Sequence, residues 1–299
     1  MIGLLIACSG PAVFPPDTGA LPPVSPYILL DAPRLLRRIR LDLGGRLPEP
    51  ADLDAVEAAP EQVWVLTEGY LDDPLLGDRL VEIWGERWGQ LRDDPLIGPA
   101  ELGIEEEEGF PFARASFEEP LRLMAHVAVS ERPWDEIVTA DYTLSTALLA
   151  QVWPVDTPAD AEGWVVSRYT DGRPMSGILS GNGLWWRHVT DESNANRRRA
   201  AAISRLLLCE DFLSRPISFS ALDVAAVDEE SAAAAIKEEP ACAGCHSTLD
   251  PLAASLFGFW WFEEHNISET GYYHAEREAL SDQILGTRPA WFGQPLGGL

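Results

Sequence analysis

The residues with the clearest chemical potential lie in one short segment, residues 241–253, which reads ACAGCHSTLDPLA. Cys242 and Cys245 are separated by two residues, and His246 directly follows the second cysteine. The chain has only 4 cysteines and 5 histidines in 299 residues, so a random ordering would contain this pattern in about 7 of 10,000 cases. The pattern therefore indicates a chemical role rather than a chance pair of cysteines.

Three chemistries use such a closely spaced cysteine pair. A structural zinc site needs four ligands, and the other cysteines, Cys8 and Cys209, are isolated in the sequence. A thioredoxin-like dithiol belongs to a βαβ pattern, which the sequence around this segment does not show. Attachment of haem c uses two thiols for thioether bonds and the adjacent imidazole as an iron ligand. We therefore expect haem c (covalent, with iron), attached at Cys242 and Cys245, with His246 as the proximal ligand.

The second axial ligand of the iron is left open by the sequence. Met175 lies in the glycine-rich segment RPMSGILS, and His274 lies 28 residues after His246. We expect one of these two residues to bind the iron, and an open sixth position is the third alternative. A thioether ligand would raise the reduction potential of the iron, and a second imidazole would lower it. His265, 19 residues after His246, is also near in sequence.

The beginning of the chain has features of an exported lipoprotein. The apolar run MIGLLIAC, residues 1–8, is similar to a bacterial lipobox in which Cys8 is the lipidated residue. The run is short and contains no Lys or Arg, so we expect the natural start to lie further upstream. Residues 9–30 are rich in proline and predict an extended tether between a lipid anchor and a folded body. A frayed apolar N-terminus is the alternative.

Composition limits the partners of the protein. The chain is 46% hydrophobic with 11 tryptophans, enough for one large core or two modest ones. Its formal charge of −26 would repel nucleic acid and anionic lipid head groups, and would attract a basic protein. No apolar run is long enough to span a membrane. We therefore expect a redox partner protein with a basic surface, no nucleic acid partner, and membrane contact only through the lipid anchor.

The pattern of apolar residues predicts a mainly α fold. Four segments have the periodicity or composition of helices: residues 74–91, 118–131, 194–212 and 230–239. The best strand candidate is WVVSRY, residues 164–169. Long Gly/Pro-rich segments such as residues 173–183 predict loops that wrap a cofactor or a neighbouring helix.

Five segments follow the order of modules in a known group of proteins. They are RRIRLDLGGRLPEPADLDAV (37–56), LVEIWGERWGQ (80–90), residues 119–150, residues 176–212, and CAGCHSTLDPLAASLFGF (242–259). The first four resemble uncharacterised helical modules. The last, in which Asp-Pro-Leu follows soon after the Cys-x-x-Cys-His motif, resembles a planctomycete-type cytochrome c domain. Together they are similar to exported multi-module haem c proteins of planctomycetes and myxobacteria.

This resemblance implies an irregular multi-helix globular body with long Gly/Pro-rich loops and a C-terminal cytochrome c-like haem segment. The expected modules are a signal segment (1–8), the tether (9–30), an N-terminal helical module (31–112), a central helical module (113–228) and the haem-binding segment (229–299). The resemblance also implies further sequence after Leu299. No reaction is established for the family, so the resemblance implies no substrate.

Electron transfer is the function that we expect from these features. The protein would be an exported, lipid-anchored haem c protein at the periplasm or cell surface, with the outer membrane as its expected location. One alternative is a haem-containing oxidoreductase, or a subunit of one, with an open distal site, so the sequence leaves open whether the protein is an enzyme. The other alternative is a cell-surface scaffold without redox activity, in which the haem only stabilises the fold.

Overall fold

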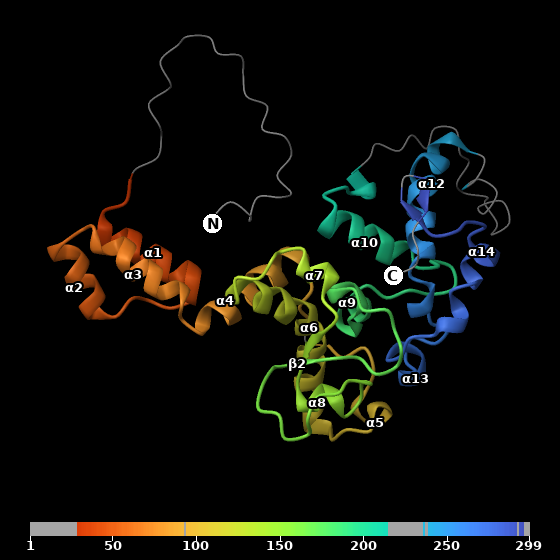
Figure 1. The fold of residues 1–299 in the computed structure, drawn as a ribbon, viewed down its shortest axis with the longest axis horizontal. Helices are drawn as coiled ribbons and strands as arrows, with labels where there is room; N and C mark the ends of the chain where they lie inside the picture. The colour runs from red at the N-terminus through yellow and green to blue at the C-terminus, as the bar shows by residue number, and fades with distance from the viewer. Residues whose placement is uncertain (1–28, 93, 215–235, 237–238, 292, 296–299) are drawn as a thin grey trace, which may run out of the picture. The chain divides into compact units, whose positions relative to one another are not determined.

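A computed structural model describes residues 29–92, 94–214, 236, 239–291 and 293–295 (Figure 1). It confirms a mainly α fold with an irregular globular body. The chain divides into two compact units, Met1–Leu80 and Val81–Leu299. Cys8, residues 9–28 of the expected tether and most of the predicted helix 230–239 lie outside the described residues. The expected module boundaries stay a prediction.

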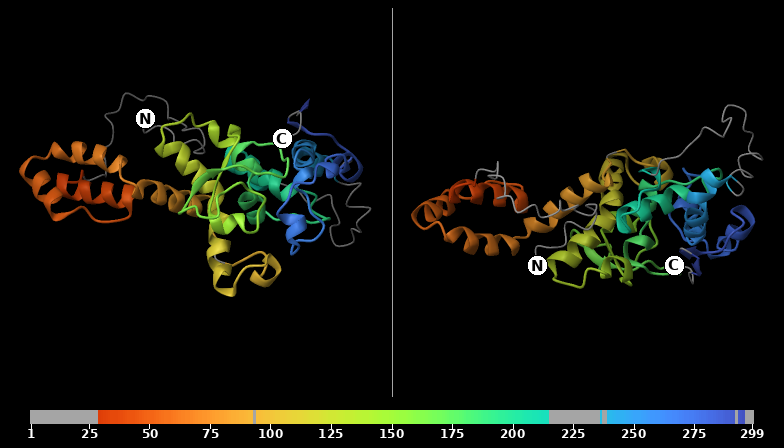
Figure 2. Two further views of the ribbon diagram at one scale, coloured as in Figure 1. Left: turned by 60° about the horizontal axis from the view of Figure 1, so that its bottom comes forward. Right: turned by 90° about the horizontal axis from the view of Figure 1, so that it is seen from above.

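The first unit is built from three helices that lie side by side within it (Figures 1 and 2). These are α1 (Ala32–Gly44), α2 (Pro50–Ala58) and α3 (Gln62–Leu71). The Asp31 carboxylate accepts the backbone N–H of Arg34 at 2.9 Å and caps the start of α1. Gly45, with a φ of +66°, ends it. Their small core consists of four buried side chains, Leu36, Val56, Val63 and Tyr70.

A fourth helix, α4 (Leu75–Trp88), continues from the first unit into the second. It confirms the helix predicted over residues 74–91. The second unit contains further helices: α5 (Pro99–Leu102), α6 (Gly109–Val129), α7 (Glu136–Thr139), α8 (Ala147–Ala150), α9 (Asn182–Arg187), α10 (Arg197–Leu207), α12 (Pro240–Ala254), α13 (Ile267–Thr270) and α14 (Leu280–Ile284). Short 3₁₀ turns lie between them: η1 (Glu106–Glu108), η2 (Gly177–Ser180), η3 (Phe212–Ser214), η6 (Phe257–Phe259) and η7 (Ala275–Arg277).

Strands contribute little to the described residues. The strand expected within 164–169 is confirmed as β2 (Val165–Ser167), which pairs antiparallel with β1 (Thr143–Ser145). A second short pair joins β3 (Ala290–Trp291) and β4 (Gln294–Pro295). Neither pair forms a layer of its own, so helices and the loops between them build the second unit.

The central helix of the second unit is α6, which begins at Gly109, well before the predicted start at residue 118. Pro120 lies inside it and cannot donate a hydrogen bond to the carbonyl of Ser116. Helix α9 approaches α6 at this point, because a Cβ on Gly183 would lie 2.0 Å from the Ser116 carbonyl oxygen. The close approach therefore requires glycine at position 183.

An aromatic core lies around α6 and α9 and extends to α12. Its largest fully buried members include Trp185, Trp186, Trp261, Phe112 and Phe257. Arg199 of α10 is fully buried in this core and lies over the ring of Trp261 at 4.0 Å. Its Nε donates to the His188 carbonyl at 2.9 Å, and its Nη1 donates to the Phe259 carbonyl at 2.5 Å. Arg199 thereby fixes the chain that follows α12.

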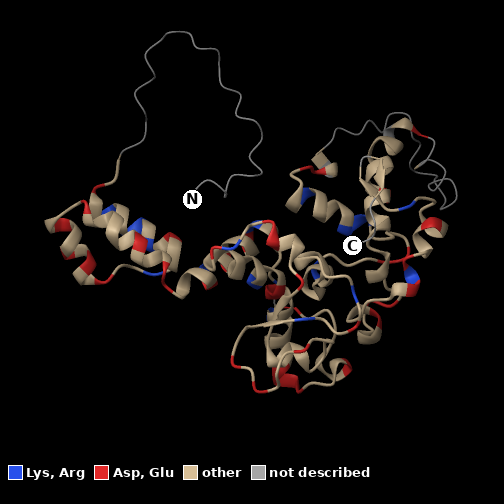
Figure 3. Ribbon diagram, in the orientation of Figure 1, with Lys and Arg blue, Asp and Glu red and all other residues tan. Residues whose placement is uncertain are grey.

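Charge is distributed unevenly over this acidic protein (Figure 3). Asp and Glu occur in both units, whereas several Arg residues gather on α1 and on α10. Helix α10 begins with three consecutive arginines, Arg197 to Arg199. They provide positive charge beside α12, which packs against α10.

Candidate functional site

The three residues of the Cys-x-x-Cys-His motif lie in the first half of α12. Pro240 occupies the first helical turn, where its missing N–H costs nothing. Cys242, Cys245 and His246 are at positions i, i+3 and i+4, so their side chains share one face of the helix. Both cysteines are free thiols, and all three side chains are partly exposed. The structure therefore brings together the three residues predicted to hold a haem.

The second half of α12 anchors this face. Leu249, Leu252 and Ala253 are buried in the aromatic core. Helix α10 lies alongside α12 in Figure 1 and in both views of Figure 2. The motif is consequently presented by a helix whose far end is fixed by packing, which limits the motion of its side chains.

The imidazole of His246 is oriented by a carboxylate one helical turn further on. Its Nδ1 lies 2.9 Å from Oδ1 of Asp250. An ionised carboxylate only accepts hydrogen bonds, so this contact requires the proton on Nδ1 and leaves the lone pair of a neutral ring on Nε2. None of the described residues hydrogen bonds to Nε2. The ring thus has one nitrogen available to a metal.

Asp250 itself is held by an arginine from the neighbouring helix. Its side chain is 9% exposed, and Arg197 donates to it from Nε at 2.7 Å and from Nη2 at 3.0 Å. Burial raises the pKa of Asp250, but the hydrogen bonds from His246 and Arg197 outweigh burial and hold the pKa below its ordinary value of 3.8. The carboxylate is therefore ionised at neutral pH.

A hollow of about 280 Å³ adjoins the imidazole. Its wall includes His246, Asp250 and Pro251 of α12, and Leu285 and Thr287 from the segment after α14. Haem c needs two free thiols and an imidazole with a free nitrogen on one accessible face, and the described residues supply this set. The donor set therefore fits the group that the sequence predicts.

The two residues expected as second ligands, Met175 and His274, lie in other segments than α12. Met175 is half-buried in the loop before η2, and neither it nor His274 is among the described residues that line the hollow at His246. Nε2 of His274 lies 3.0 Å from the Glu269 carbonyl oxygen, and its Nδ1 lies 3.4 Å from Oε1 of Glu276, which is an ion pair only when the ring is protonated. The identity of the second axial ligand stays a prediction.

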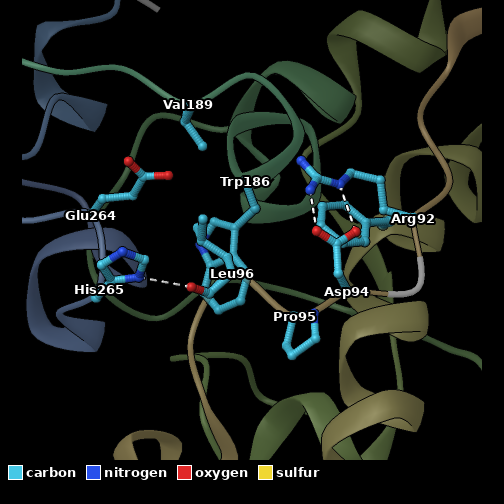
Figure 4. A pocket seen from close by; sticks show the side chains of 9 residues that line it. Arg92, Asp94, Pro95, Leu96, Trp186, Val189, Glu264 and His265 are labelled. Atoms are coloured by element: carbon cyan, nitrogen blue, oxygen red, sulfur yellow. Dashed lines mark hydrogen bonds and ion pairs between the residues drawn. The ribbon is translucent and has the colours of Figure 1, made fainter.

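His265 lies at a separate hollow of about 220 Å³ (Figure 4). Its Nδ1 is 2.9 Å from the carbonyl oxygen of Leu96. Figure 4 shows Arg92 and Asp94 on the other side of this hollow, beyond the indole of Trp186. The two hollows share no lining residue among those described, so the structure does not bring His265 and His246 to one site.

Sequence reasoning missed two residues of the candidate site, Asp250 and Arg197. The spacing of four residues between His246 and Asp250 is a signal that a helix would bring their side chains together. Arg197 lies 53 residues before Asp250, and no local pattern connects them. Only the packing of α10 on α12 makes this ion pair.

The described residues hold no group of three or more His, Cys, Asp or Glu side chains placed to bind a metal ion. They also contain no helix of the length and apolar character needed to cross a bilayer.

Comparison with known proteins gives a family match. The family model described as PSCyt3, Protein of unknown function (DUF1588), matches residues 175–262, which include α9, α10 and the whole of α12. This family is associated with planctomycete-type cytochrome c proteins. The match supports a cytochrome c relation for this stretch, whereas the expected multi-module arrangement stays a prediction. No curated protein and no solved structure matches the chain.

Proposed function

We propose that this protein is an exported, membrane-anchored c-type haem protein that transfers electrons at the periplasm or cell surface. The observation that carries the proposal is the common face of α12 that presents Cys242, Cys245 and His246. This face lies within the stretch that matches the cytochrome c-associated family. The negative charge of the chain favours a redox partner with a basic surface.

In this proposal each residue of the motif has a defined task. Cys242 and Cys245 would hold the porphyrin through thioether bonds, each formed by adding a thiol S–H across a vinyl double bond, and His246 would supply Nε2 to the iron. Haem supplies one-electron chemistry when it is bound. The fixed half of α12 and the Asp250 carboxylate hold the imidazole in place, so that the protein controls the environment of the iron.

A haem oxidoreductase is the second candidate. It is favoured by a contact of His274, whose Nε2 lies 3.0 Å from the Glu269 carbonyl oxygen and so already has a partner within the protein. An iron with an open sixth position would offer a substrate a place to bind. The wild-type optical spectrum separates the two candidates: a low-spin protein that resists carbon monoxide is a carrier, and a high-spin protein that binds it rapidly is an enzyme candidate.

Covalent attachment is the decisive test of the proposal. The chain is expressed with a c-type maturation system, and haem is measured after acid-acetone extraction and on denaturing gels. We expect covalent haem in the wild type and none after Cys242→Ala with Cys245→Ala. The control is Glu239→Ala, which changes an exposed side chain at the start of the same helix and away from the hollow, and should leave attachment unchanged. Covalent haem that persists in the double variant, or its absence from the wild type, would overturn the assignment.

Anchoring is tested separately on the natural precursor. If Cys8 is the lipidated residue, the precursor should incorporate a labelled fatty acid and sediment with membranes. Cys8→Ser should abolish the label and release the protein. A wild-type precursor without label would refute the lipid anchor while leaving the haem site untouched.

A further inference from the structure

We propose that Asp250 and Arg197 are positioning residues that set the tautomer of His246 and tune the reduction potential of the haem iron in opposite directions. The inference rests on the proposed function, because it concerns the same imidazole. It adds a means by which this chain controls the iron.

One carboxylate oxygen of Asp250 is shared by two donors. Oδ1 of Asp250 lies 2.9 Å from Nδ1 of His246 and 2.7 Å from Nε of Arg197. Oδ2 accepts a further hydrogen bond from Nη2 of Arg197 at 3.0 Å. One carboxylate therefore joins the imidazole to a guanidinium. Its negative charge interacts with both the imidazole N–H and the guanidinium.

Asp250 and Arg197 have opposite effects on the basicity of the imidazole. A carboxylate that accepts the Nδ1 proton fixes the tautomer and raises the basicity of Nε2 as a ligand. A more basic imidazole stabilises the oxidised iron and lowers the reduction potential. Arg197 withdraws negative charge from the same carboxylate and weakens this effect. Loss of Asp250 should therefore raise the potential, and loss of Arg197 should lower it.

Arg197 is itself held in place for this contact. It is the first residue of α10 and follows Asn196, whose backbone has a φ of +65°. The Asn196 N–H donates to Oγ1 of Thr190 at 2.8 Å, and its Nδ2 donates to the Leu256 carbonyl at 3.1 Å. Both Asn196 and Thr190 are buried. The start of α10 is thus fixed, as a positioning contact requires.

The first experiment measures the midpoint reduction potential of haem-loaded variants. Asp250→Asn keeps the shape of the side chain and removes its charge, so the potential should rise. Arg197→Gln should lower it. The matched control is Arg198→Gln, which removes the same charge from an exposed neighbour on α10 and should change the potential less than Arg197→Gln. Shifts of the same sign in Asp250→Asn and Arg197→Gln would overturn the proposal.

The second experiment needs no haem. The full chain has five histidines, so labelling with ¹⁵N-histidine gives five imidazoles whose tautomers are read from two-bond proton–nitrogen correlations. In spectra of the wild type recorded at mildly alkaline pH, His246 should carry its proton on Nδ1. Asp250→Ala should shift the population toward the Nε2–H form.

The two experiments separate the two levels of inference. A chain that shows the Nδ1–H tautomer and acquires no covalent haem refutes the proposed function and leaves the positioning contact in place. A chain that acquires haem and shows His246 mainly as the Nε2–H form refutes the positioning role. The wild-type tautomer decides this even if Asp250→Ala does not fold.

Discussion

Two buried carboxylates of the second unit, Glu119 and Asp250, lie in contrasting surroundings. Counted over the whole residue, Glu119 on α6 is 1% exposed and Asp250 on α12 is 6% exposed. Glu119 accepts hydrogen bonds from the Thr143 hydroxyl at 2.8 Å, the Tyr169 hydroxyl at 2.7 Å and the Gly183 N–H at 2.7 Å. Asp250 instead accepts from the cation Arg197 and from His246.

The two carboxyl groups titrate in opposite directions. Burial raises the pKa of Glu119 above its ordinary value of 4.5, although its three donors and the charge of Arg173 oppose the shift. Burial also raises the pKa of Asp250, but the hydrogen bonds from His246 and Arg197 have the larger combined effect and lower the pKa below its ordinary value. The opposite directions follow from the cation that bonds directly to Asp250 and from the deeper burial of Glu119.

Because their surroundings differ, Glu119 and Asp250 also have different roles. Glu119 joins α6 to β1, to Tyr169 and to the start of α9, so it holds the Gly/Pro-rich chain against the central helix. Arg173 in that chain lies over the Tyr169 ring at 3.6 Å and donates to the Ser180 carbonyl at 2.8 Å. The contacts of Glu119 are structural, whereas those of Asp250 orient an imidazole at the surface.

The largest effect is expected from Glu119→Ala. The substitution leaves three buried donors without an acceptor and opens a cavity beside α9, so the free energy of unfolding should fall by about 4 kcal/mol. Urea denaturation followed by tryptophan fluorescence measures this loss. A loss below about 1 kcal/mol would be typical of an exposed site and would contradict the structural role of Glu119.

A smaller effect is expected from Asp250→Ala. The side chains of Arg197 and His246 are 20% and 22% exposed, so both can turn toward water when the carboxylate is removed. The free energy of unfolding should therefore fall by only about 1–2 kcal/mol in the same assay. If this variant loses as much stability as Glu119→Ala, the contrast between a structural and an orienting carboxylate fails.

The sequence predicted the chemical motif more completely than its surroundings. Spacing alone identified Cys242, Cys245 and His246, because the motif is local and a helix keeps its residues on one face. Apolar periodicity likewise predicted α4, α10 and the later part of α6. These predictions depend only on neighbours in sequence.

Glu119 was not identified from the sequence, because it stands beside Glu118 at the start of a predicted helix and reads as a solvated charge. Its partners lie 24, 50 and 64 residues later in the chain. The helix was also predicted to start too late, since Pro120 suggests a first turn rather than the interior of α6. Such contacts follow from tertiary packing, which local patterns do not encode.

The smallest expected effect is a change in how stability depends on pH. The folded-state pKa of Glu119 lies above the ordinary value of 4.5, so the folded protein binds this proton more tightly than the unfolded chain. Its contribution to stability is complete below pH 4.5 and is lost as the pH rises through the folded-state pKa.

Glu119→Gln removes this titration, so the midpoint of thermal unfolding should fall less steeply with rising pH than in the wild type. Tyr169, which donates to Glu119, does not titrate in this range, because burial raises its pKa further above the ordinary value of 10.0. An equal slope in the two proteins would mean that Glu119 is ionised throughout, and the contrast with Asp250 would then rest on geometry alone.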